Sequence, residues 1–138
     1  MLVVLSHIAQ LPSIALKETI LVVEDDIALR KGMSMLLRAA GLDVSVAGSL
    51  AEARQQLSTA VPSRMILDLN LPDGLGMELL QEIRHLGLPT RVLILSGAAA
   101  SPCPDAQVLG IDAYVIKPPD WDKLLQWASG KGGGDLWK

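Results

Sequence analysis

Four apolar runs in the chain each end in a side chain that can do chemistry. In chain order these side chains are the acids Glu24, Asp25 and Asp26, then Asp68, then the hydroxyl of Ser96 and the amine of Lys117. A carboxylate at the end of a strand can serve as a nucleophile or as a metal ligand. Because ligands bind beyond the carboxyl ends of the strands in an open parallel sheet, we expect these groups to meet in one acidic crevice.

The carboxylates of Glu24, Asp25 and Asp68 predict a cation site. Two like charges about 4 Å apart repel by about 4 kcal/mol at a surface-like dielectric, so a cation is needed to hold them together. Oxygen ligands without a nearby histidine or cysteine motif favour Mg²⁺ over Zn²⁺. The plainer alternative for Glu24 and Asp25 is favourable negative charge at a helix N-terminus. We interpret Asp26 as a helix cap or a solvated residue.

Asp68 and Lys117 together predict phosphoryl transfer. In this interpretation the Asp68 carboxylate attacks a phosphoryl group and forms an acyl phosphate, while Mg²⁺ and Lys117 offset the charge on the phosphoryl oxygens. Such a reaction depends chiefly on positioning and electrostatics. The alternatives are a turn acid for Asp68 and a solvated surface amine for Lys117. Pro118, directly after Lys117, favours a fixed cation instead.

Alternating strands and helices are predicted to position these residues. Strands are predicted at residues 19–24, 43–47, 64–68, 91–96 and 113–116. Helices are predicted up to Ala40, from a capping box at Ser49 and Glu52, after the turn at 72–74, weakly at 105–109, and from Asp120 to Ala128. Right-handed crossovers then favour an α/β fold, a flavodoxin-like (βα)5 doubly wound parallel sheet with strand order 2-1-3-4-5.

Composition supports one domain with an aliphatic core. The 138 residues are 50% hydrophobic but only 3% aromatic, without phenylalanine, which suits a parallel sheet buried on both faces. The net charge of −3 and the scattered basic residues argue against nucleic-acid binding by this domain. The single cysteine, Cys103, excludes an internal disulfide and fits a reducing compartment.

The two ends of the chain differ from its centre. Residues 1–18 form an apolar extension that is too short and too often interrupted by polar residues and proline to be a membrane span. We expect this extension to pack on the domain or on a partner. Residues 130–138 contain four glycines, three of them in a row, and predict a flexible tail, in which we expect no room for an output domain.

The ordered set of an acid pair, Asp68, Ser96 and then Lys117 with Pro118 resembles the receiver domain of bacterial two-component response regulators. The resemblance covers residues 19–129. It implies a cytoplasmic phosphoacceptor that takes a phosphoryl group from a sensor histidine kinase or a phosphotransfer protein onto Asp68. It also implies that the domain catalyses only its own phosphorylation and dephosphorylation, and is otherwise not an enzyme.

The resemblance assigns further roles within the site. It implies that the main-chain carbonyl of Asn70 is another Mg²⁺ ligand and that the bond between Lys117 and Pro118 is cis. It implies that Ser96 turns its hydroxyl toward the new phosphoryl group while Tyr114 swings inward, which makes a two-state switch.

Phosphorylation is expected to alter the face built from the segment after Ser96, the strand that carries Tyr114 and the helix from Asp120 to Ala128. The resemblance implies a phosphorylation-dependent homodimer, with a partner protein as the alternative. Trp121 and Trp127 are expected to supply apolar area on this face. Two departures from the family pattern are Pro102 and Pro104, which predict a short or shifted fourth helix, and Glu24 in place of the more frequent aspartate.

Three other functions remain as alternatives. A haloacid-dehalogenase-type aspartyl phosphatase needs a second acid where this chain has Asn70. An FMN-binding flavodoxin-like module needs a phosphate cradle where Glu24, Asp25 and Asp26 would repel the phosphate. A receiver-shaped scaffold that is never phosphorylated does not need the complete set of acids.

Overall fold

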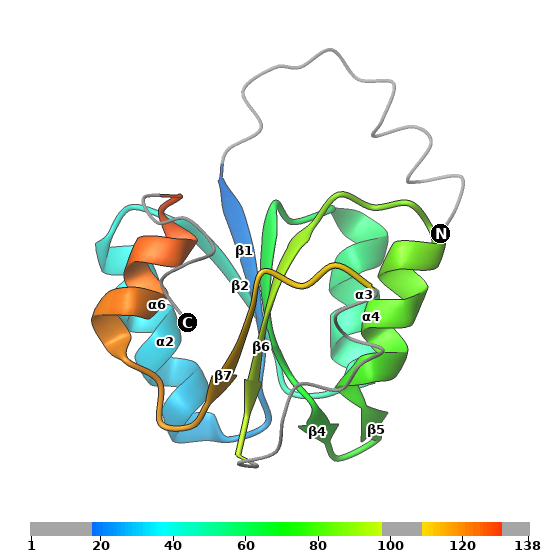
Figure 1. The fold of residues 1–138 in the computed structure, drawn as a ribbon, viewed down its shortest axis with the longest axis horizontal. Helices are drawn as coiled ribbons and strands as arrows, with labels where there is room; N and C mark the ends of the chain where they lie inside the picture. Colours follow the sequence, from blue (N-terminus) through cyan, green and yellow to red (C-terminus); the bar gives the residue numbers. More distant parts are fainter. Residues whose placement is uncertain (1–17, 98–108, 131–138) are drawn as a thin grey trace.

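A five-stranded parallel sheet forms the centre of the molecule (Figure 1). The computed structural model describes residues 18–97 and 109–130, and its sheet strands are β1 Thr19–Val23, β2 Asp43–Ala47, β3 Arg64–Asp68, β6 Arg91–Ser96 and β7 Ala113–Ile116. The spatial order is β2-β1-β3-β6-β7. Counted among themselves, these strands have the order 2-1-3-4-5, which confirms the predicted flavodoxin-like fold.

The helices cover both faces of the sheet (Figure 1). On one face lie α2 Ile27–Ala39 and α6 Trp121–Ala128, and on the other lie α3 Leu50–Thr59 and α4 Gly76–His85. Successive strand residues point to opposite faces, so Leu21 and Val23 pack with α3 and α4 while Ile20 and Val22 pack with α2 and α6. Both sides of each central strand are therefore buried, which is why these strands are continuous apolar runs.

Side-chain caps start three of the described helices as the sequence predicts. The Asp26 carboxylate accepts from the Leu29 amide at 3.0 Å, and the Asp120 carboxylate accepts from the Lys123 amide at 3.2 Å. The Ser49 hydroxyl accepts from the Glu52 amide at 3.1 Å. Each cap lies only three residues from its partner, so local sequence is sufficient to specify it.

The structure differs from the sequence prediction in three places. The first strand ends at Val23 and leaves Glu24 in the following loop. A short antiparallel hairpin, β4 Asn70–Leu71 and β5 Gly74–Leu75, forms at the turn that follows β3. Trp127 is 3% exposed and its indole nitrogen donates to Asp112 Oδ2 at 2.8 Å, so it belongs to the core instead of an outer surface.

Several predictions fall outside the described residues. These are the apolar extension before residue 18, the tail after residue 130, and almost all of the weak helix at 105–109 with Pro102 and Pro104 before it. Within the two described ranges, no helix is both long enough and apolar enough to cross a membrane.

Candidate functional site

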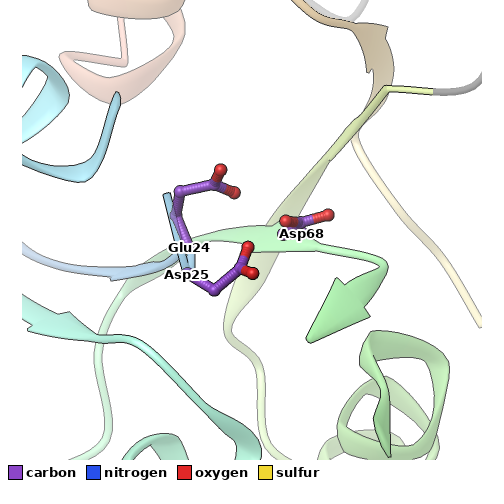
Figure 2. A group of neighbouring side chains, drawn as sticks. All are labelled: Glu24, Asp25 and Asp68. Atoms are coloured by element: carbon purple, nitrogen blue, oxygen red, sulfur yellow. The ribbon is translucent and has the colours of Figure 1, made fainter. Parts of the chain in front are cut away.

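Three carboxylates meet at the carboxyl edge of the sheet (Figure 2). One oxygen from each of Glu24, Asp25 and Asp68 lies within 4.8 Å of the other two. Glu24 and Asp25 directly follow β1, and Asp68 is the last residue of β3. Since β1 and β3 are parallel neighbours, both strands end at the same edge and bring their terminal acids together.

Lys117 donates hydrogen bonds to two of these acids. Its Nζ donates to Glu24 Oε1 at 2.7 Å and to Asp68 Oδ2 at 3.1 Å. Lys117 directly follows β7, and its peptide bond to Pro118 is cis. Its backbone amide donates to the carbonyl of Ser96 at 2.7 Å, which ties the ends of β6 and β7 to each other.

Burial dominates the electrostatics of the site. The side chains of Glu24 and Asp68 are 1% and 4% exposed, whereas that of Lys117 is 24% exposed. Burial raises the pKa of Glu24 to about 7, with a further contribution from Asp68, and Lys117 only partly opposes the rise. Burial is the largest single influence on Lys117 and disfavours its charge, but the hydrogen bonds and negative charges of Glu24 and Asp68 together outweigh it and raise the pKa of the amine.

The donor set fits a hard cation. Within the described part of the chain, Glu24 Oε2 is buried without a hydrogen-bond partner. An orphaned carboxylate oxygen in a cluster of three acids is the arrangement that a cation would stabilise. The ligand atoms offered by this cluster are all carboxylate oxygens, which suit Mg²⁺ better than a softer metal.

The remaining predicted site residues lie in β4, β6 and β7. The backbone amide of Asn70 donates to Asp68 Oδ1 at 3.0 Å, so the loop after β3 folds back on the Asp68 carboxylate. Ser96 is the last residue of β6 and is 1% exposed. Tyr114 lies in β7, is half-buried, and packs against the core on the side of α3 and α4. The structure thus brings Glu24, Asp25 and Asp68 within 4.8 Å of one another and joins Lys117 to Glu24 and Asp68 by hydrogen bonds.

Two residues beside the site were not singled out by sequence. Arg30 Nη1 donates to the carbonyl of Glu24 at 3.0 Å and so supports the loop that carries the acid pair. Gly76 donates its amide to the carbonyl of Leu69 at 2.8 Å, directly behind Asp68. Arg30 sits six residues after Glu24, and that spacing alone does not distinguish it from the other basic residues of the helix.

A lysine held between two buried acids at the carboxyl edge of a 2-1-3-4-5 sheet matches a known family. The family model described as the response regulator receiver domain matches residues 20–129. The chain belongs to this family. It therefore contains a receiver domain of the kind used in two-component signalling, whose general role is to accept a phosphoryl group.

Curated relatives support this assignment. The chain is 31% identical over 122 residues to the acid tolerance regulatory protein ActR of Sinorhizobium medicae, a match that covers 88% of this chain and 63% of the relative. It is 31% identical over 99 residues to the KDP operon transcriptional regulatory protein KdpE of Escherichia coli, covering 72% of this chain and 44% of that protein. The chain thus spans about half the length of these relatives.

Solved structures agree at the level of the fold and the family. A CheY-like receiver domain protein from Methanospirillum hungatei has a TM-score of 0.73 and 27% identity, covering 83% of this chain and 93% of the other. The receiver domain of a putative Luxo repressor protein from Vibrio parahaemolyticus has a TM-score of 0.77 and 26% identity, covering 84% and 90%. Receiver domains in general work with histidine kinases or phosphotransfer proteins. Membership of this family argues against the phosphatase and FMN-binding alternatives.

Proposed function

We propose that Asp68 is the phosphoacceptor and that its donor is the phosphohistidine of a sensor histidine kinase or of a phosphotransfer protein. The observation that carries the proposal is the hydrogen bond of 3.1 Å between Lys117 Nζ and Asp68 Oδ2 inside a cluster of three acids. A buried carboxylate next to a fixed amine can bring a phosphoryl group and its counter-charge into one place.

The transfer exchanges one bond to phosphorus for another. An oxygen of Asp68 attacks the phosphorus atom and forms an acyl phosphate, while the bond between phosphorus and the donor imidazole nitrogen breaks. The electron pair of the broken bond stays on that nitrogen, which then takes a proton. Lys117 lies within hydrogen-bond distance of Asp68 and donates to the phosphoryl oxygens as they arrive. The domain therefore catalyses its own modification and acts on no other substrate.

Mg²⁺ is the cofactor that the donor set supports. Glu24, Asp25, Asp68 and the main-chain carbonyl of Asn70 would hold the ion, and the orphaned Glu24 Oε2 supports this assignment. When bound, Mg²⁺ neutralises charge on the phosphoryl oxygens.

The output of the modification is a changed surface. Ser96 is the last residue of β6 and Lys117 directly follows the neighbouring strand β7, so a phosphoryl group that contacts both side chains couples the ends of the two strands. Tyr114 lies in β7 and is half-buried, which leaves room for a change of its side-chain position. We assign the readout to self-association through the face formed by β7 and α6, with no nucleic-acid contact by this domain.

Chemical labelling tests the assignment of Asp68. The domain is incubated with Mg²⁺ and acetyl phosphate or phosphoramidate, and intact mass spectrometry counts the added phosphoryl groups. We expect one addition on the wild type, stable in acid and labile in base, and none on Asp68→Asn. Asp26→Asn is the matched control, because Asp26 lies next to the acid pair but caps α2, and it should label like the wild type. Equal labelling of Asp68→Asn, or none of the wild type under any of these conditions, would contradict the proposal, and the second result would favour the scaffold alternative.

A further inference from the structure

Asp73 connects the loop after Asp68 to the start of helix α3. Its Oδ1 accepts from the Leu50 amide at 2.8 Å and its Oδ2 accepts from the Ala51 amide at 3.0 Å. The two residues of each pair lie 23 and 22 positions apart in the chain. These two hydrogen bonds lower the pKa of Asp73, so the carboxylate is ionised at neutral pH and the link is intact.

The first turn of α3 therefore receives caps from two different sources. The Ser49 hydroxyl accepts from the Glu52 amide, and the Ser49 carbonyl accepts from the Ala53 amide at 3.0 Å. Asp73 accepts hydrogen bonds from the two amides of this turn that Ser49 does not bind, those of Leu50 and Ala51. Asp73 lies in a hairpin far along the chain. Ser49 already caps this helix end locally, so what Asp73 adds is a link between the helix and the distant hairpin.

The hairpin that carries Asp73 is continuous with the acceptor site. Asn70 pairs with Leu75 across the hairpin, and the Asn70 amide also donates to Asp68 Oδ1 at 3.0 Å. The hairpin rests directly on α3, because a Cβ atom placed on Gly74 would lie 2.6 Å from Leu50 Cδ1. The hairpin therefore contacts both Asp68 and α3, and Figure 1 shows β4 and β5 beyond the end of the sheet, close to α4.

We propose that Asp73 is a positioning residue for the phosphoacceptor site, which anchors the hairpin of residues 70–75 on α3 and thereby holds the main chain of Asn70 over Asp68. The inference rests on the proposed function, since the Asn70 carbonyl is a metal ligand only there. Asp73 itself touches neither the metal nor the phosphoryl group. Loss of the anchor lets the hairpin move and loosens the metal site while leaving its carboxylates in place.

The test compares Asp73→Ala and Asp73→Asn with Ser49→Ala in the whole chain. Mg²⁺ affinity is measured by calorimetric titration, and stability by thermal unfolding in EDTA. We expect Asp73→Ala to weaken Mg²⁺ binding by about tenfold, the low end of what loss of a supporting hydrogen bond costs a metal site. Asp73→Asn keeps one acceptor oxygen and should restore part of the affinity. Ser49→Ala removes a cap from the same helix end without touching the hairpin, and should lower stability but leave Mg²⁺ affinity unchanged.

Labelling with a small phosphoryl donor separates positioning from damage to the fold. The Asp73→Ala variant should label slowly at low Mg²⁺ and recover most of the wild-type rate at saturating Mg²⁺. Unchanged Mg²⁺ affinity in both Asp73 variants overturns the inference, and so does an equal loss of affinity in Ser49→Ala. A wild type that labels on Asp68 while the Asp73 variants bind Mg²⁺ normally leaves the proposed function standing and refutes only the role of Asp73. A wild type that neither binds Mg²⁺ nor labels refutes both.

Discussion

Glu24 is buried in surroundings that disfavour its charge. Its pKa is about 7 in the folded domain against an ordinary value of 4.5, because burial raises it more than Lys117 lowers it. The folded state therefore binds a proton on Glu24 more tightly than the unfolded state does. The resulting stability is fully present below pH 4.5 and is lost as the pH rises through about 7.

Metal-free unfolding at several pH values checks this contribution. Between pH 5 and pH 8 in EDTA, the free energy of unfolding of Glu24→Gln should fall less than that of the wild type. At pH 8 the variant should be the more stable of the two, by on the order of 1 kcal/mol. Added Mg²⁺ should reverse this order, because the ion stabilises the ionised carboxylate that glutamine lacks. If the free energy of unfolding of the wild type and of the variant changed with pH in parallel, the pKa of Glu24 would not be raised in the folded domain.

At the scale of single elements, helix α4 begins directly against the main chain of Asp68. A Cβ atom on Gly76 would overlap the carbonyl oxygen of Asp68 and lie 3.1 Å from the Cα of Leu69. Backbone atoms cannot move aside as a flexible side chain can. We expect Gly76→Ala to destabilise the domain by about 2 kcal/mol and to weaken Mg²⁺ binding, since the strain falls on Asp68 itself.

Gly32 provides a matched control inside helix α2. A Cβ atom there would lie 3.5 Å from the ring of Trp121, which is ordinary van der Waals contact. Gly32→Ala should therefore raise the free energy of unfolding by about 0.5 to 1 kcal/mol, because alanine favours the helix more than glycine does. Urea unfolding of both variants measures the difference. Similar destabilisation by both substitutions would mean that the close approach of Gly76 to Asp68 is not what matters.

At the scale of the whole molecule, the site joins strands from both halves of the sheet. Lys117 follows the edge strand β7, while Glu24 follows β1, three positions away in the strand order. We expect a change of charge at Asp68 to act on β1, β3, β6 and β7 together. On β7 and α6 the large apolar side chains exposed for contact are Ile116 at 47% and Trp121 at 40%.

Amide hydrogen exchange with beryllofluoride, a phosphoryl mimic, tests this coupling. With saturating mimic and Mg²⁺, exchange should change in residues 91–97 and 109–128 and stay nearly constant in β2, on the opposite edge of the sheet. Light scattering of the same samples should show self-association with the mimic and not without it. An exchange pattern that is identical in the two states would rule out the switch, even with Asp68 as acceptor.

The sequence by itself determined the five strands of the sheet and the residues at most of their ends. Apolar runs bounded by charged or turn residues are local patterns, and they placed Asp68 and Lys117 at strand ends correctly. The caps at Asp26, Ser49 and Asp120 were equally predictable, because each partner lies three residues away. Alternation of strand and helix, with right-handed crossovers, was then enough to specify the strand order.

Only the tertiary structure decided which of these groups touch. Lys117 reaches Glu24 across 93 residues of chain, and Asp73, which looks like an ordinary turn acid, caps a helix 23 residues before it. Trp127 has the amphipathic setting of a surface residue in the sequence, yet its ring is buried and its nitrogen is bonded to Asp112. Such contacts depend on distances and burial set by several packed elements at once. A short stretch of sequence does not contain that information. It does contain the hydrophobic period and the end residues of a strand or helix.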